Sequence, residues 1–365
     1  MSSFAALGFA LVLAATNLAS GFAIARAPYA YAFPRDHAAH DRYRTEWWYF
    51  TGHVKAKDGH TFGYELTFFR VGLEPHARHL MPGQSRWRAS ELYPAHFAIT
   101  DETAHSFVYS RTLAREALGQ GGASQSVLDV RANGWRLTGR KSGGRFMMHA
   151  AANEAGDAID FVLTPQKPPA IHGIGGISKK GPCASCASHY YSFTRLTTTG
   201  TLRRSGVSRT VAGISWMDHE YGTDELQPGQ AGWDWFSIQL DDRRELMLYR
   251  IRRKNGGVSP QSSGSLIGTS GSVRHVPLGE FTVSATGTWV SPHTHARYPS
   301  GWIVTANGLD RQLRLTPTLA DQELVDASGG VTYWEGSVRV TDAKTGARLG
   351  VGYVELTGYA GAVTL

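Results

Sequence analysis

The stretch EWWYFTGHVKAKDGHTFGYELTFFR, residues 46–70, decides the fold. Two runs rich in aromatic and β-branched residues flank a polar break that contains the hairpin-turn dipeptide Asp58-Gly59. This pattern predicts two antiparallel strands joined by a short turn. A related stretch, GWDWFSIQLDDRRELMLYRIR at residues 232–252, repeats the arrangement later in the chain. The repeat predicts that one β unit is duplicated.

The remainder of the chain carries mostly strand signals. Short runs rich in aromatic and β-branched residues recur between turn signals such as Asn133-Gly134. Only residues 112–117 and 319–324 have the pattern of short helices. Many evenly spaced strands without alternating helices predict an all-β protein made of antiparallel barrels rather than a parallel sheet.

The length of 365 residues suggests two domains. We expect an N-terminal domain over residues 33–222 and a C-terminal domain over residues 223–365, because Trp233 opens the repeated hairpin. The Pro- and Gly-rich segment 165–188 is predicted to be structureless, and it could be an interdomain linker. Because so long a structureless stretch more often forms a functional loop, we favour a lid that closes a ligand pocket between the domains. Trp216 and Trp233 are expected near that interface.

The N-terminal end has the pattern of a secretory leader. An uncharged, apolar run over residues 4–15 is followed by Ala23-Ile24-Ala25, which has the small-residue pattern of a cleavage site. Residues 1–25 are therefore predicted to be a signal peptide, since the apolar run is short for a membrane span. We expect the protein to be exported, to the periplasm or the extracellular space.

Charge and motifs argue against several function classes. The formal net charge is +7 without a Lys/Arg block, so nucleic acid is not an expected partner, whereas weak peripheral contact with an anionic membrane surface stays open. The chain has no G-x-S-x-G elbow, phosphate-binding loop or dinucleotide fingerprint. His37 and His40 have a spacing compatible with a metal, but no H-E-x-x-H or comparable set completes it. We expect neither a metal nor an organic cofactor.

The two cysteines, Cys183 and Cys186, have C-x-x-C spacing. This spacing is compatible with a redox pair or with half of a metal site, although the other half of a Cys-type zinc site is missing. In an oxidising compartment a local disulfide in a loop is the favoured interpretation.

The densest group of chemically active residues lies in the stretch SWMDHEYG. On a strand, Asp218 and Glu220 would share a face with Trp216. His219 and Tyr221 would then point to the opposite face. If the first face lines an apolar barrel, a carboxyl beside Trp216 loses solvation and its pKa rises, which suits it to donate a proton. A structural salt bridge at a barrel rim is the alternative interpretation.

Aromatic residues gather in sequence around this polar group. They suit an elongated apolar ligand and could stabilise a developing cation through their ring faces, or they could simply fill a core. The candidate ligand-binding residues are Trp47, Trp48, Tyr49, Trp216, Tyr221, Trp233 and Trp235.

Several long motifs carry a family resemblance. FPRDHAAHDRYRTEWWYFTGHV, GISWMDHEYG, YWEGSVRV and GYVELTGYA, together with the two hairpin stretches, resemble the AttH family of exported lipocalin-like proteins, which are related to CrtC-type carotenoid 1,2-hydratases. The resemblance runs over residues 33–360. It implies two lipocalin-like antiparallel β-barrel domains packed together. The chain departs from the family at GPCASCASHYYS, where a loop without cysteines is expected.

The first function that these features favour is that of an exported protein that binds an apolar lipid or isoprenoid in the cell envelope. The predicted leader, the barrels and the clustered aromatic residues support it. Family members are often described as secreted hydrolases, a third alternative. A hydrolase would need a nucleophile or a metal-bound water, and neither has a motif here.

The second function is that of a carotenoid 1,2-hydratase-like lyase, which adds water to an isoprenoid double bond. A neutral carboxylic acid must then donate a proton, ring faces must shield the cation, and water must be delivered from one side. Asp218 is the candidate acid and His219 the candidate to position water, with Trp216 beside the cation. Glu220 completes the candidate catalytic group.

Overall fold

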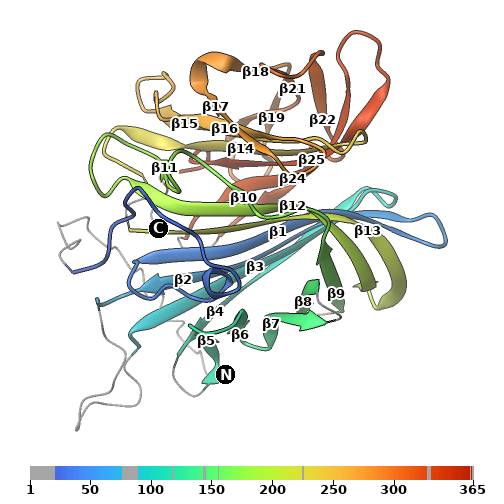
Figure 1. Cartoon of the computed structure of the whole chain (residues 1–365). Coiled ribbons are helices and arrows are strands. Elements are labelled where there is room, and N and C mark those ends of the chain that lie inside the picture. Colours follow the sequence, from blue (N-terminus) through green and yellow to red (C-terminus); the bar gives the residue numbers. More distant parts are fainter. Residues whose placement is uncertain are drawn as a thin grey trace, which may run out of the picture.

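A computed structural model describes residues 21–75, 89–116, 119–142, 145–154, 156–223, 226–326, 330–361 and 363 of the protein. The first 20 residues of the predicted signal peptide lie outside the described residues. Two large antiparallel sheets make up most of the described chain and pack one above the other in Figure 1. Within the described residues, no helix has the length and apolar character needed to cross a membrane.

The first sheet has 13 strands in the described part of the chain. They are β1 Thr45–Ala56, β2 Thr61–Gly72, β3 Glu91–Asp101, β4 Ser106–Arg115, β5 Gly121–Ala123, β6 Asp129–Ala132, β7 Trp135–Ser142, β8 Arg145–Glu154, β9 Asp157–Pro165, β10 Ala170–Ile171, β11 Ser178–Lys179, β12 Ala187–Arg204 and β13 Val207–Gly222. The order is β4-β3-β2-β1-β13-β12-β9-β8-β7-β6-β5, and β10 and β11 add to β12. Because β5 and β6 pack back against β3 and β4, this sheet nearly closes into a barrel.

The second sheet has 10 strands among the described residues. They are β14 Gln230–Leu240, β15 Glu245–Arg253, β16 Ser263–Ile267, β17 Val273–Pro277, β18 Phe281–Ala285, β21 Trp302–Ala306, β22 Leu313–Pro317, β23 Glu323–Leu324, β24 Tyr333–Asp342 and β25 Arg348–Thr357. The order is β17-β16-β15-β14-β25-β24-β22-β21-β18, with β23 on β24. A separate hairpin joins β19 Thr288–Val290 to β20 Arg297–Pro299.

Both sheets contain the hairpin that the sequence repeat predicted. β1 pairs with β2 on one side and with β13 on the other, and β14 pairs in the same way with β15 and β25. Each hairpin places an acid directly opposite an arginine, Glu46 opposite Arg70 and Asp234 opposite Arg250. The two barrels meet through these central strands, because β1 packs against β25 and β2 against β24.

Alternation along the strands fills the interior of each barrel. Trp48, Phe50 and Leu66 point into the first barrel. Phe236 and Trp302 point into the second. Full burial of one such side chain contributes roughly 1.5–3 kcal/mol, so these two cores dominate the stability of the fold. The predicted class, all-β with two lipocalin-like antiparallel barrels packed together, is confirmed.

The two short helices predicted from the sequence are wrong. Residues 112–115 continue β4 and pair residue by residue with β3. Residues 319–322 are not helical, and Glu323–Leu324 pairs with β24 as β23. In both places the order of polar and apolar residues is too irregular to distinguish the helical period from the strand period. Pairing with a neighbouring strand therefore determines the secondary structure.

The segment 165–188, here called the strap, lies between the two barrels (Figure 1). It is not structureless, because it carries β10 and β11 on the edge of β12. Lys167 anchors it to the second barrel through an ion pair with Glu245, with 2.6 Å between Nζ and Oε2. His172 adds a contact of 2.8 Å to the hydroxyl of Ser265. The strap therefore covers the region where the barrels meet.

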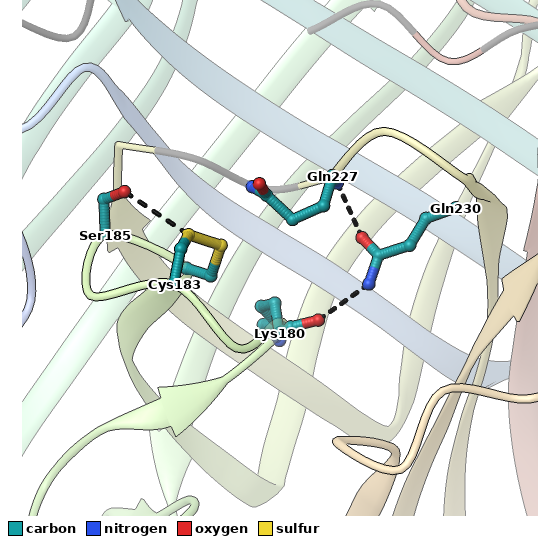
Figure 2. The surroundings of a disulfide bond; sticks show 6 residues. Lys180, Cys183, Ser185, Gln227 and Gln230 are labelled. Carbon is teal, nitrogen blue, oxygen red and sulfur yellow. Dashed lines mark hydrogen bonds between the residues drawn. A yellow bond between two sulfur atoms is a disulfide. The ribbon is translucent and has the colours of Figure 1, made fainter.

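Cys183 and Cys186 form a disulfide near the end of the strap (Figure 2). The side chain of Gln230, at the start of β14, donates a hydrogen bond of 2.8 Å to the carbonyl of Lys180. Figure 2 shows this bond beside the disulfide turn. The turn is thus held against the first strand of the second barrel.

Candidate active site

Strand β13 divides the sequence-predicted catalytic residues between two places. Asp218 faces the second barrel together with Trp216. His219 faces the interior of the first barrel, where it contacts Glu46 and Trp48. Neighbouring residues on a strand point to opposite faces, so the structure does not bring Asp218 and His219 together. Water held by His219 would lie on the wrong side of the sheet for Asp218.

Aromatic side chains from both barrels meet on the Asp218 side of β13. The ring of Trp235 lies edge-on to Tyr49 and to Trp216, with 5.2 Å and 6.2 Å between ring centroids. Five predicted ligand-binding residues belong to this group. We call it the interface cluster, and its aromatic members are Trp47, Tyr49, Tyr190, Trp216, Trp233, Trp235, Tyr249 and Tyr353.

Asp218 is buried in the interface cluster and accepts three hydrogen bonds from uncharged donors. Its Oδ1 accepts from the hydroxyl of Ser192 and, at 2.6 Å, from Nε1 of Trp216. Its Oδ2 accepts from the hydroxyl of Tyr190 at 2.8 Å, and Trp235 donates to Tyr190 in turn. Burial raises the pKa of Asp218 to about 7, against the opposing effect of these hydrogen bonds. Asp218 can therefore exchange a proton near neutral pH.

A chain of hydrogen bonds leads from Asp218 into the second barrel. The hydroxyl of Ser192 lies 2.6 Å from Nε2 of His172, and Nδ1 of His172 lies 2.8 Å from the hydroxyl of Ser265. Burial lowers the pKa of His172 to about 3, so the ring is neutral and can pass a proton between its two nitrogens. Sequence reasoning missed His172 because only the folding of the strap brings it to β12.

Three further acids, which the sequence analysis also missed, extend into the interface cluster: Glu65 and Glu335 are buried, and Glu355 is partly buried. Glu335 and Glu355 are directly opposite each other on β24 and β25, and Glu65 projects from β2. Burial raises the pKa of Glu65 to about 7 and that of Glu355 to about 8. Burial, reinforced by Glu355 and Glu65, raises the pKa of Glu335 well above its ordinary value. With Asp218 we call these residues the interface carboxyls.

The signal for these acids was a single glutamate inside each of several apolar strand motifs, as in YWEGSVRV and GYVELTGYA. Their hydrogen-bond donors are uncharged. The hydroxyl of Tyr49 donates to Oε1 of Glu335 at 2.7 Å, and Nε1 of Trp233 donates to Oε2 of Glu355 at 3.1 Å. Among the described residues, Oε2 of Glu335 and Oε2 of Glu65 have no hydrogen-bond partner.

Glu220 shares this face of β13 but has a cationic partner. Its Oε1 lies 2.9 Å from Nζ of Lys180 and accepts a hydrogen bond from the hydroxyl of Ser188. The same Lys180 ammonium lies over the rings of Tyr190 and Tyr249, 5.3 Å and 4.3 Å from their centroids. Glu220 therefore forms the structural salt bridge that the sequence analysis left open, and it ties the strap to β13.

The interior of the first barrel holds a second polar group, the inner cluster of Glu46, His40, His219 and Arg70. Oε1 of Glu46 lies 2.8 Å from Nε2 of His219 and 2.9 Å from Nδ1 of His40. Nε of Arg70 donates to Oε2 of Glu46 at 2.9 Å. Burial acts to raise the pKa of Glu46, but both histidines and Arg70 outweigh it and hold the pKa well below its ordinary value.

The inner cluster includes a possible set of metal ligands. One atom each from His40, Glu46 and His219 lie within 4.8 Å of one another. Sequence spacing did not show this set, because Glu46 and His219 are 173 residues apart. His37, the expected partner of His40, instead lies 2.7 Å from a tyrosine hydroxyl. A cation at these ligands would compete with Arg70, which already compensates the charge of Glu46.

The two remaining ligand-binding candidates, Trp48 and Tyr221, pack against the inner cluster instead. The Trp48 ring stacks on His219 with 4.8 Å between centroids. The Tyr221 ring stacks on His40 with 3.7 Å between centroids. Both rings fill the first barrel and have no place in the interface cluster.

The match to known proteins covers nearly the whole described chain. A family model described as AttH-like matches residues 24–359. The chain belongs to the AttH-like family. An AttH protein from Nitrosomonas europaea is 33% identical to this AttH-like protein, with a TM-score of 0.81 over 93% of this chain and 99% of that one. No curated protein matches the sequence.

Two more distant structures share the fold of this AttH-like protein. Kievitone hydratase from Nectria haematococca is 14% identical, with a TM-score of 0.68 over 94% of this chain and 97% of its own. CghA is 12% identical, with a TM-score of 0.51 over 87% of this chain and 90% of its own. At these identities the likeness shows the fold alone.

The interface cluster of the AttH-like protein combines three properties that proton chemistry on an apolar molecule needs. It offers carboxyls that are protonated near neutral pH, ring faces from both barrels, and a hydrogen-bonded chain through His172. A small open hollow of about 270 Å³ on β7–β9, lined in part by Arg140 and His149, shares no residue with either cluster.

Proposed function

We propose that this AttH-like protein is a hydro-lyase that adds water to a carbon–carbon double bond of an apolar, unsaturated substrate between its two barrels. One observation carries the proposal. Asp218 is a buried carboxyl whose hydrogen-bond donors are all uncharged, and its pKa is raised to about 7 by burial beside the rings of Trp216 and Trp235. A group of this kind suits acid–base catalysis at neutral pH.

The reaction has a simple proton balance. A protonated carboxyl gives its proton to one alkene carbon, which breaks the π bond and leaves a carbocation on the other. The ring faces of Trp216 and Trp235 are suited to stabilise that cation. The oxygen of a water molecule then bonds to the cation and loses one proton to a carboxylate. No redox partner is needed, and the protein regains its starting charge.

The composition of the interface cluster favours an elongated isoprenoid or related polyene as the substrate. Eight aromatic side chains from both barrels gather around the interface carboxyls, which suits an apolar chain with one reactive double bond. The shared fold with kievitone hydratase is consistent with a hydration reaction. Because of the predicted leader, the proposed location of the reaction is the periplasm or the outside of the cell, where such lipids meet a membrane surface.

Substrate access is proposed to involve the strap. Its ion pairs, Lys167 with Glu245 and Lys180 with Glu220, hold it over the interface cluster. Release of the strap would uncover Asp218, which is 4% exposed. The strap would then act as the lid that the length of this segment suggested.

A carrier of apolar lipid or isoprenoid is the second candidate, favoured by the same aromatic residues. A carrier has no use for buried carboxyls without cationic partners, since each one costs free energy. The hydrolase alternative gains one contact, between the hydroxyl of Ser192 and His172. In a serine hydrolase the acid orients the histidine, whereas here Asp218 accepts directly from Ser192.

The test is incubation of the purified mature protein in H₂¹⁸O with lycopene in detergent micelles, and separately with kievitone. We expect mass spectrometry to find one labelled water added to a substrate, and the Asp218→Asn variant to lose this product while still taking up lycopene. Asp310→Asn, at an exposed position, is the matched control. Uptake of lycopene without product in the wild type would favour the carrier.

A further inference from the structure

Glu335 on β24 extends from the second barrel toward the first. Its side chain is 1% exposed, and the hydroxyl of Tyr49, on β1 of the first barrel, donates to its Oε1 at 2.7 Å. Its Oε2 is buried and has no hydrogen-bond partner among the described residues. Tyr49 is also the cross-strand neighbour of Asp218, whose charge acts on its phenol. Buried carboxyl oxygens without partners are rare and point to a functional role.

We propose that Glu335 donates the proton to the alkene carbon and that Asp218 accepts the proton of the adding water, so that each barrel supplies one half of the acid–base pair. This proposal rests on the proposed hydration. It reverses the role that the sequence suggested for Asp218.

The hydrogen-bond pattern distinguishes the two acids. Both oxygens of Asp218 accept hydrogen bonds, and one of the donors, the indole of Trp216, can never accept one. Three donors match the ionised form, which has acceptors only. Glu335 has a single donor on Oε1, which leaves Oε2 available to carry a proton toward the interface. This pattern matches a neutral carboxylic acid.

The charges around Glu335 lead to the same assignment. The acids that face it come from three strands, Glu355 on β25, Glu65 on β2 and Asp218 on β13, and all of them oppose its ionisation. Burial and these neighbours raise the pKa of Glu335 well above its ordinary value, whereas the three donors on Asp218 favour its ionised form. Where two coupled carboxyls differ in this way, the one that holds its proton more tightly serves as the acid.

The proton balance closes within the cluster. Glu335 loses a proton to carbon, and Asp218 gains one from the attacking water. The resting state returns when one proton moves from Asp218 to Glu335. Tyr49 is suited to pass it, because its hydroxyl already bonds Glu335 and its chain neighbour across the strand pair is Asp218.

The first test is the pH profile of lycopene hydration, measured as kcat/KM. If Asp218 is the base, activity rises as the pH is raised through about 7 and falls only at more alkaline pH, when Glu335 ionises. If Asp218 is the acid, activity falls as the pH is raised through about 7, which would overturn the proposal.

The second test is the Glu335→Gln variant. It should lower kcat by about 100-fold or more and leave lycopene affinity within about twofold. Glu323→Gln is the control, because Glu323 is also 1% exposed in the second barrel but accepts from three hydroxyls outside the interface cluster. It should keep the wild-type kcat. Unchanged kcat in Glu335→Gln would overturn the assignment.

Infrared spectroscopy separates the failure of this assignment from the failure of the proposed function. At mildly alkaline pH without substrate, the wild type should show a carboxylic acid C=O band that Glu335→Gln loses and Glu323→Gln keeps. If the wild type hydrates a probe but Glu335→Gln retains the band, only the donor assignment fails. If the wild type hydrates neither lycopene nor kievitone, the proposed function fails and the donor role fails with it.

Discussion

The inner cluster and the interface cluster lie on the two faces of one strand. β13 supplies His219 to the first and Asp218 to the second, one residue apart. In the inner cluster, Glu46 has a guanidinium and two imidazoles within hydrogen-bond distance. In the interface cluster, the four interface carboxyls accept no hydrogen bond from Lys or Arg in the described part of the chain. Glu46, Asp218 and Glu335 are all buried, and the compensation of charge is what differs between them.

The compensation of charge determines which of these buried acids can transfer a proton. Arg70 and His40 keep Glu46 ionised, and its pKa is held well below the ordinary value by its hydrogen bonds and by the charge of Arg70. Such a group gives up no proton in the normal pH range and serves the fold. Within the described residues Asp218 and Glu335 have no such partner, so burial raises the pKa of both: Asp218 exchanges a proton near pH 7, and Glu335 keeps its proton at neutral pH. They are the groups available for proton transfer.

Removal of the cation from the inner cluster should have the largest effect on stability. Arg70→Met leaves Glu46 and Glu91 buried beside an apolar side chain, and breaking a buried ion pair in this way typically costs about 3–5 kcal/mol. Urea unfolding followed by tryptophan fluorescence measures the loss. Arg209→Met, which removes a surface pair with Asp58, is the control and should leave the midpoint nearly unchanged. Equal midpoints for the two variants would contradict the structural role of the inner cluster.

The two clusters should respond to pH with opposite signs. The interface carboxyls have a raised pKa in the folded protein. Their contribution to folding stability is therefore fully present below the pKa of the unfolded chain, about 4, and is lost as the pH rises toward about 7 for Asp218 and Glu65. Each such carboxyl weakens the fold by about 1.4 kcal/mol per pH unit within that window. Glu46 has a lowered pKa, so its contribution is present above the unfolded value and is lost as the pH falls.

A variant can sharpen this prediction. Glu65→Gln should flatten the loss of stability between about pH 5 and about pH 7 and leave the loss in acid unchanged. Denaturant midpoints of the wild type and the variant, measured from acid to neutral pH, check both the loss of stability toward neutral pH and the loss in acid. A wild-type fold that gains stability steadily up to pH 7 would show that the interface carboxyls are ionised after all.

Loss of the Tyr49 hydroxyl, which donates to Glu335, should have a moderate effect. Tyr49→Phe removes the hydrogen bond to Glu335, which costs about 1 kcal/mol of stability, and the route for returning the proton. We expect lycopene hydration to slow by about tenfold. Turnover and unfolding are measured on the same preparation. A Tyr49→Phe variant as fast as the wild type would remove Tyr49 from the proton path.

The disulfide turn should matter least. Cys183 and Cys186 are three residues apart, so their bond restricts the unfolded chain little, and Cys183→Ser with Cys186→Ser should cost about 2 kcal/mol or less. Differential scanning calorimetry measures the change. A loss as large as that in Arg70→Met would mean that the turn secures the strap far more strongly than its hydrogen bond from Gln230 indicates.

Local patterns in the sequence predicted much of the fold. The repeated hairpin, the all-β class and the separation of Asp218 from His219 onto two faces of one strand all follow from strand periodicity. The clusters themselves could not be predicted, because long-range pairing builds them. Tyr49 and Glu335 are 286 residues apart, and Glu46 and His219 are 173 apart. Which face of β13 meets the second barrel depends on how the two barrels dock, and no local pattern contains that information.

Comparison of Asp218→Asn with His219→Gln tests the central claim most directly, because these neighbours belong to different clusters. The measurement is the rate of ¹⁸O-water addition to lycopene per folded molecule, with the folded fraction taken from tryptophan fluorescence. We expect Asp218→Asn to lose about 100-fold or more in rate with its fold intact, whereas His219→Gln should be less stable but keep its rate per folded molecule. Full activity in Asp218→Asn, with activity lost in folded His219→Gln, would contradict it and move the chemistry into the first barrel.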